Sequence, residues 1–262
     1  MVQGKKGSGS GSAKAKGKEP AKGARSSVRK GKKPDNYNPS DPPKKPAAPR
    51  ESKSGEHEVY EERKPIPEKN QHGQLVFDDA PDFRPNLTPK EVLQRGSFGG
   101  TYFRPIHSGV TGQDYKDAHK EFPEDWFEGL NVAKRVTSSI YDTDVNTYGV
   151  KCGTDLSDWE EKGWITELDP FGWFQWYCRY YLGRRTSDDE RQLGRAARCF
   201  GPKGRWRIQL MNKVGRAGTS YDDKSISPVI RQVLQHWGYV LTERDYQLHK
   251  KQNGKRMGFK GM

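Results

Sequence analysis

Eight basic side chains follow one another between residues 184 and 207, and a cluster of this kind can bind the phosphate groups of nucleic acid. Lysine and arginine bind backbone phosphates through charge, without reading the base sequence. The cluster consists of Arg184, Arg185, Arg191, Arg195, Arg198, Lys203, Arg205 and Arg207. The sequence therefore predicts a surface that binds DNA or RNA largely independently of base sequence. The alternative is that these cations form salt bridges with the acidic first half of the same chain.

A second pattern, YDTDVN, places two carboxylates and an amide close together. Asp142, Asp144 and Asn146 carry the hard oxygen atoms that bind divalent cations. The pattern lacks the glycine and the distal glutamate of a calcium-binding loop, and Asp and Asn are also common turn residues. We therefore interpret it as a turn, and we predict no metal site and no cofactor.

A thiol and an imidazole offer nucleophilic chemistry if the fold brings them together. Cys152 and His107 form such a pair, with Asp142 able to orient the imidazole. The alternative function is an enzyme with an aromatic-lined pocket that includes the GSFGG loop at 96–100. Its reactive group would be either Cys152 or the pair Asp142 and Asp144. This alternative stays open, as does a third one, an interaction scaffold that uses the acidic segment before the domain.

The basic cluster follows an unusually aromatic stretch, FGWFQWYCRYYLGRR, at residues 171–185. Trp173, Trp176, Tyr177 and Tyr180 recur at helical spacing, and Phe174 opens a second, overlapping stripe. So wide an apolar arc is typical of a helix at the centre of a core, and buried Trp and Tyr need polar partners for their tips. We therefore predict a core helix rather than a platform on which bases stack.

Capping residues, prolines and glycines divide the rest of the chain into elements. Four helices are predicted in the second half, at 170–183, 187–201, 204–215 and 227–238, with Ser187 and Ser227 as caps. The first half is predicted to be rich in loops. It has a helix from Thr88 to Gly96, a short strand at 101–103, one or two strands within 138–153 and a helix capped by Ser157. The fold class is mainly α, or α+β at most.

Composition and charge divide the chain into four parts. Residues 1–50 are predicted to be a disordered basic tail, 51–80 a proline-rich and acidic linker, 81–246 one globular domain, and 247–262 a basic disordered tail. The total charge of +13 is uneven, with +11 in 1–50, −10 in 51–170 and +8 in 171–216. Leu75, Val76, Phe77 and Phe83 are expected to dock an extended segment on the domain.

The basic tail contains a cluster that is typical of nuclear import signals, namely Arg29, Lys30, Lys32 and Lys33. Nuclear import receptors are therefore expected partners, and a nuclear or nucleocytoplasmic location is predicted. No apolar leader or membrane-spanning stretch is visible, and the three cysteines show no paired spacing, which favours free thiols in a reducing compartment.

Four motifs together resemble a family of proteins found in fungi, protists, some animals and bacteria. They are GSFGGTYFRPI, YGVKCG, DPFGWFQWYCRYYLGRR and SPVIRQVLQHWGY, and the resemblance covers residues 82–246. The family has no established activity, so the resemblance implies no catalytic residue.

Overall fold

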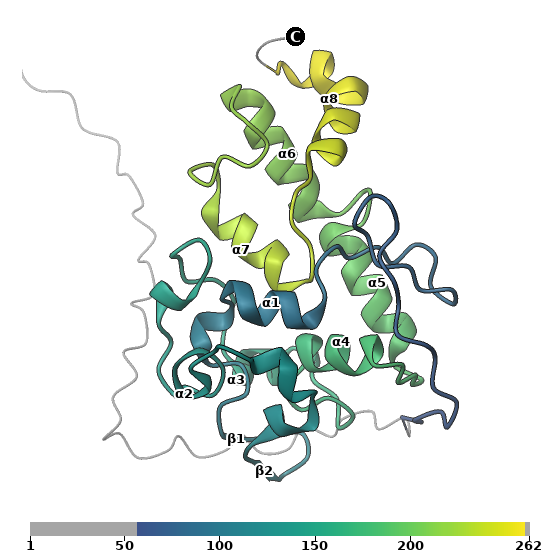
Figure 1. Ribbon diagram of the computed structural model, residues 1–262, viewed down its shortest axis with the longest axis vertical. Coiled ribbons are helices and arrows are strands. Elements are labelled where there is room, and N and C mark those ends of the chain that lie inside the picture. Colours follow the sequence, from purple (N-terminus) through teal and green to yellow (C-terminus); the bar gives the residue numbers. More distant parts are fainter. Residues whose placement is uncertain (1–56, 260–262) are drawn as a thin grey trace, which may run out of the picture. The chain divides into compact units, whose positions relative to one another are not determined.

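The structure is a computed structural model that describes residues 57–259, apart from the side chain of Met257, and its described part is mainly helical (Figure 1). The predicted basic tail and import cluster lie outside the described residues. The described α-helices are α1 (Pro89–Arg95), α2 (Val132–Arg135), α3 (Leu156–Glu161), α4 (Trp173–Tyr181), α5 (Asp189–Phe200), α6 (Arg205–Ala217), α7 (Pro228–His236) and α8 (Glu243–Met257). The prediction of a mainly α fold with a helical second half is confirmed.

The first half is rich in loops, but its short strands are not where the sequence predicts them. The strand predicted at 101–103 is a turn, and the one strand pair of the described residues comes just after it, as β1 (Ile106–His107) and β2 (Asp114–Tyr115) in antiparallel register. The strands predicted within 138–153 are also wrong, because the chain forms a 3₁₀ turn at Thr143–Val145. In both segments glycines and Asx side chains bend the backbone more strongly than β-branched residues extend it.

The start of α1 has the predicted geometry. Thr88 Oγ1 accepts a hydrogen bond from the Glu91 N–H at 3.1 Å, and the Glu91 carboxylate accepts one from the Thr88 N–H at 2.7 Å. The caps predicted for two other helices are wrong, because α3 is capped by Asp155 instead of Ser157 and the N-cap of α5 is Asp188 instead of Ser187. Ser227 is the N-cap residue of α7, as predicted, but its side chain makes no capping hydrogen bond.

Helix α4 is the centre of the core, as predicted. Its aromatic side chains are almost completely buried, except for the partly exposed Tyr181, and Phe83 packs against four of the buried ones with ring centroids 5.9–6.4 Å away. Two of the polar tips have the expected partners, because Trp176 Nε1 donates to Asp189 at 2.9 Å and Tyr177 Oη donates to the Leu87 carbonyl at 2.6 Å. This packing leaves none of the buried rings of α4 free to stack on a base.

The segment before α1, residues 57–85, lies against the helical half and belongs to the same compact unit. Leu75, Phe77 and Phe83 are buried, which confirms the predicted docking, while Val76 is partly exposed. Further up the segment, the Tyr60 and Lys64 N–H groups donate to carbonyls of the loop between α4 and α5 at 2.9 Å. The part of the predicted linker that the structure describes is therefore docked.

A helix also replaces the predicted C-terminal tail. α8 runs to Met257, where the sequence indicates disorder from residue 247. It is held by polar contacts and by its two ends: Thr242 caps it, His249 bonds to Asn212 of α6 at 2.8 Å, and Phe259 packs onto Gly215. A Cβ atom at position 215 would lie 2.5 Å from the Phe259 ring, so the glycine allows the approach. The prediction of a disordered tail was based on the scarcity of apolar residues in 247–262, and that scarcity does not reveal polar contacts or contacts at the helix ends.

Candidate nucleic-acid interface

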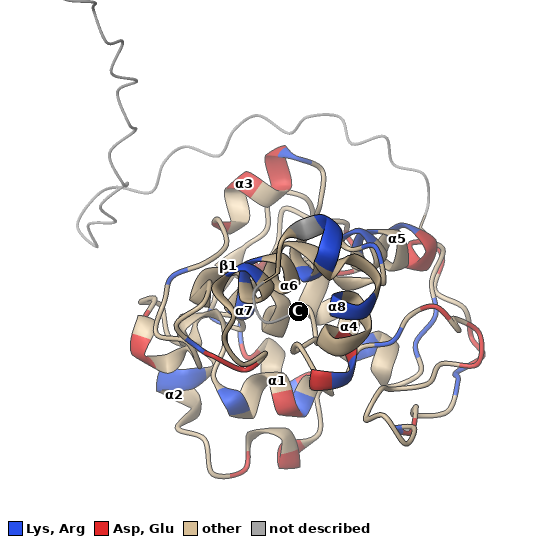
Figure 2. Cartoon of the chain, turned by 90° about the horizontal axis from the view of Figure 1, so that it is seen from above, with Lys and Arg blue, Asp and Glu red and all other residues tan. Residues whose placement is uncertain are grey.

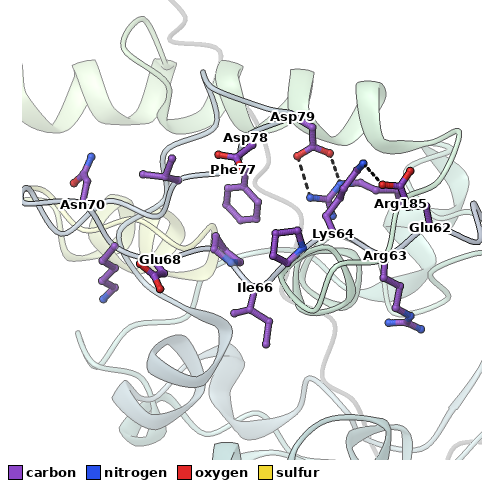
Figure 3. Close-up of a pocket in the computed structure, with 14 residues that line it drawn as sticks. Glu62, Arg63, Lys64, Ile66, Glu68, Asn70, Phe77, Asp78, Asp79 and Arg185 are labelled. Carbon is purple, nitrogen blue, oxygen red and sulfur yellow. Dashed lines mark hydrogen bonds and ion pairs between the residues drawn. The ribbon is translucent and has the colours of Figure 1, made fainter.

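Arg184 and Arg185, at the beginning of the predicted cluster, point into the protein. Arg184 Nη2 lies 2.6 Å from the buried Asp169 carboxylate, and Arg185 Nε lies 2.6 Å from Asp79 (Figure 3). The Arg185 guanidinium also lies 3.7 Å from the centre of the Tyr180 ring. Their side chains are only 10% and 8% exposed, so neither is free to meet a phosphate group.

Two more members of the cluster are paired within the protein. Arg191 Nη2 donates to Asp188 at 2.8 Å, and Arg207 Nη2 lies 2.8 Å from Asp245. Four of the eight predicted cations therefore form internal ion pairs. Arg184 and Arg185 pair with acids of the first half, as the salt-bridge alternative expects, whereas the other two pair with acids of the second half. Three of the four carboxylates are themselves buried, and the exception, Asp79, lies in the docked segment.

Arg195 has a different environment. Its guanidinium lies 5.4 Å from the Trp164 ring centre and 5.5 Å from that of Trp237, and its hydrogen bond goes to Gln192. Burial, together with the positive charge of Arg191, lowers the pKa of Arg195 to about 10. The Arg195 side chain therefore packs against these two tryptophan rings.

The remaining members of the cluster, Arg198, Lys203 and Arg205, are exposed, and the structure shows no ion pair for them among residues 57–259. They lie at the end of α5, in the following turn and at the start of α6. The cluster thus does not form one surface, and only this last part of it faces solvent.

The exposed cations continue along α6 and α8 instead. Arg205, Lys213 and Arg216 lie at i, i+8 and i+11 on α6, and an α-helix places these positions on one face. Arg244, Lys251 and Lys255 lie at i, i+7 and i+11 on α8 and share a face in the same way. We call these six residues the α6–α8 basic surface.

The two helices of this surface pack against each other, and few acids accompany them. No Asp or Glu occurs in 191–221 or in 246–259. Figure 2 shows blue ribbon on α8 close to α6 in the middle of the view, and red ribbon on α3 near the upper edge. Sequence reasoning missed Lys213 and Arg216, although their spacing from Arg205 was visible, and it assigned the lysines of α8 to a tail.

A surface hollow beside Arg185 has mixed charge (Figure 3). It has a volume of about 720 Å³, and the docked segment forms most of its lining. Lys64 pairs with Glu62, and the Arg185–Asp79 pair forms one wall. Because the cations in it are largely compensated, this hollow is not a candidate phosphate site.

The predicted nucleophile pair is not formed. His107 Nδ1 lies 2.8 Å from Asp114 on the β1–β2 hairpin, whereas Cys152 Sγ lies 3.5 Å from Nδ1 of His236. Sequence reasoning did not connect His236 with the thiol, because 84 residues separate them.

The hydrogen bonds of His236 determine which nitrogen carries its proton. Nε2 accepts from the Phe98 N–H at 2.9 Å and from the Gln232 amide at 3.1 Å, so the proton lies on Nδ1 and points at the Cys152 sulfur. Burial raises the pKa of Cys152 to about 12 and lowers that of His236 to about 3. The imidazole therefore cannot accept the thiol proton, which a nucleophile requires.

The GSFGG loop packs into the core rather than around a pocket. The Phe98 ring stacks 4.0 Å from His236 and lies 4.9 Å from Phe174, and a Cβ at Gly99 would lie 2.5 Å from the Tyr141 ring. Neither hollow that the structure describes is lined by this loop or by Cys152. The enzyme alternative gains no support from this arrangement.

Asp142 and Asp144 form a turn, as interpreted from the sequence. Asp142 accepts a hydrogen bond from the Asp144 N–H at 2.9 Å, and Asn146 bonds to the Gly99 N–H and to Tyr141. In residues 57–259, no group of three or more His, Cys, Asp or Glu side chains is placed to hold a metal ion.

Comparisons with models of protein families, with curated proteins and with solved structures find no match to the chain. In the part of the chain that the structure describes, no helix is both long enough and apolar enough to cross a membrane.

Proposed function

We propose that the protein binds the phosphate backbone of nucleic acid through the α6–α8 basic surface, largely independently of base sequence. The observation that supports this is the pair of cationic faces on two adjacent helices that carry hardly any exposed acid. Exposed lysines and arginines bind phosphates by releasing the counterions of the nucleic acid. The four internally paired arginines of the predicted cluster are not part of this proposal.

Polar side chains accompany the cations on the same faces. Gln209 lies between Arg205 and Lys213 on α6, and Gln247 and Gln252 are exposed on α8. Amides of this kind donate to phosphate oxygens and position a backbone without reading bases. The basic tail would add further phosphate contacts, and the import cluster at residues 29–33 accounts for the expected nuclear location and import receptors.

Charge reversal on the basic surface tests the proposal. Lys213→Glu with Lys251→Glu removes two phosphate contacts, one from each helix, and the full chain is used. The matched control is Lys116→Glu with Lys224→Glu, since both lysines are exposed and lie on other elements. Fluorescence anisotropy with a labelled 20-nucleotide single strand and a 20-base-pair duplex, measured from 50 to 200 mM salt, gives the affinity and its salt dependence.

We expect the surface variant to lose affinity at every salt concentration. The slope of log affinity against log salt should become shallower by about 1.4 for the single strand and about 1.8 for the duplex, because each lost contact removes about 0.7 or 0.9. The control should keep most of its slope. Equal losses in both variants would show that net charge and the tail, rather than this surface, account for binding.

A further inference from the structure

A second, smaller hollow of about 290 Å³ lies next to the basic surface. It lies where the α5–α6 turn, the docked segment and α8 meet. Its lining residues are Gln74, Asp82, Arg84, Phe200, Gly201, Pro202, Arg207, Met211, Arg244, Asp245, Leu248, His249 and Gln252. The volume is slightly below the range of pockets for drug-sized molecules, which indicates a small group as its occupant.

Two guanidinium groups that line this hollow have nitrogen atoms without an acceptor. Arg84 Nη1 is shut off from solvent and has no hydrogen-bond partner, and the structure shows no ion pair for Arg84 among the described residues. Arg207 Nε is buried and unpartnered as well, although Nη2 of the same group binds Asp245. Leaving charged donors buried without an acceptor costs free energy. An acceptor that enters the hollow and bonds to these donors recovers that free energy.

The charges around the hollow favour an anion. Three arginines line it, Arg84, Arg207 and Arg244, against two aspartates. One of these, Asp245, is already engaged by Arg207 and by the Tyr239 hydroxyl at 2.8 Å. Burial, and after it the positive charge of Arg207, lowers the pKa of His249, which favours its neutral form.

We propose that this hollow is a phosphoryl-binding site in which Arg84 and Arg207 donate to the phosphate oxygens. Guanidinium groups fit oxyanions with several oxygen atoms because they present several N–H donors in one plane. Arg244 belongs both to the hollow and to the basic surface, so a phosphate bound in the hollow continues that surface. Where the phosphate belongs to nucleic acid, the inference rests on the proposed function.

Inorganic phosphate is the first probe, because it tests the hollow without any nucleic acid. Binding to the full chain is measured by titration calorimetry and by the shift in Tm, with ionic strength held constant by sodium chloride. The test variant is Arg84→Gln, which removes a side chain with no partner in the structure. Arg198→Gln is the matched control, since it makes the same charge change at an exposed arginine outside both the hollow and the α6–α8 basic surface.

We expect phosphate to bind the natural sequence and Arg198→Gln with similar affinity. Arg84→Gln should bind about tenfold more weakly, as expected for the loss of one charge-assisted hydrogen bond. The Tm of Arg84→Gln without phosphate should stay at or above that of the natural sequence, which shows that the variant is folded. Equal phosphate affinity for both variants, or no phosphate binding at all, overturns the site whatever the result with nucleic acid.

Two 20-nucleotide single strands, one with and one without a 5′-phosphate, identify the source of the phosphoryl group. If backbone phosphates occupy the hollow, Arg84→Gln weakens both strands more than Arg198→Gln does. If a terminal or free phosphate monoester occupies it, Arg84→Gln weakens only the phosphorylated strand. Should neither strand bind while inorganic phosphate does, the proposed function fails and the site stands as one for a free phosphate-bearing molecule.

Discussion

Mild acid should destabilise the protein through one histidine, His236 of α7. Its Nε2 accepts two hydrogen bonds, from the Phe98 N–H and from Gln232, and its ring is stacked on Phe98. A second proton has no place on this ring, because Nε2 faces donors and Nδ1 already carries hydrogen. Burial accordingly lowers the pKa of His236 to about 3.

The size of the effect follows from the difference between the folded and the unfolded pKa. In the unfolded chain a histidine has a pKa of about 6.5. As the pH falls below that value the unfolded state takes up a proton and the folded state does not, so stability falls by up to about 1.4 kcal/mol per pH unit. Between pH 7 and pH 5 the loss from His236 alone is about 2 kcal/mol, and it continues until the folded pKa is reached.

Urea unfolding at pH 7, 6 and 5 measures this loss, with His236→Gln as the comparison. The glutamine keeps an acceptor for the Phe98 N–H and does not titrate. Burial also lowers the pKa of His119 and His249, but both residues are present in either protein and their contributions cancel. The natural sequence should therefore lose about 2 kcal/mol more than the variant between pH 7 and pH 5. If both proteins lose the same amount, His236 is not held neutral by the contacts described.

Two further predictions concern stability. The buried Asp169 carboxylate is shared by Arg184 Nη2, at 2.6 Å, and Arg179 Nη1, at 3.0 Å. Asp169→Asn removes it, so the free energy of unfolding in urea should fall by about 3–5 kcal/mol, and a loss below about 1 kcal/mol would contradict this shared ion pair. Gly99→Ala and Gly112→Ala both place a side chain at positive φ, which costs about 1–2 kcal/mol of stability. The two variants differ in their surroundings, because only the Cβ at position 99 meets a ring, that of Tyr141, at 2.5 Å. The Gly99 variant should therefore have clearly the lower Tm in differential scanning calorimetry, and equal values would contradict the packing of the loop.

Local sequence signals predicted the helices better than the strands. α1 and α7 begin at prolines, Gly96 ends α1, and the aromatic spacing of α4 identified the centre of the core. The strand predicted at 101–103 failed because the pattern is only three residues long. Tyr102 and Phe103 are buried in a turn, where burial alone accounts for their apolar character.

The candidate interface was harder to predict, because the sequence shows where cations are but not which acids reach them. Asp79 pairs with Arg185 across 106 residues, and no local spacing indicates that contact. α8 was missed for a related reason, since contacts with α6 hold it rather than an apolar face of its own. The cationic face of α6 could have been predicted, because the helical spacing of Lys213 and Arg216 from Arg205 is visible in the sequence.

The contact between the docked segment and the α4–α5 loop has a consequence for dynamics. Residues 58–64 are held by a few backbone hydrogen bonds to this one loop, and the carbonyl of Lys64 comes so close to Gly183 that a Cβ there would lie 2.1 Å from it. Segments with few buried apolar contacts open at a lower free energy than the core does. We therefore expect residues 58–64 to open as a separate unit, which detaches and returns many times for each global unfolding event.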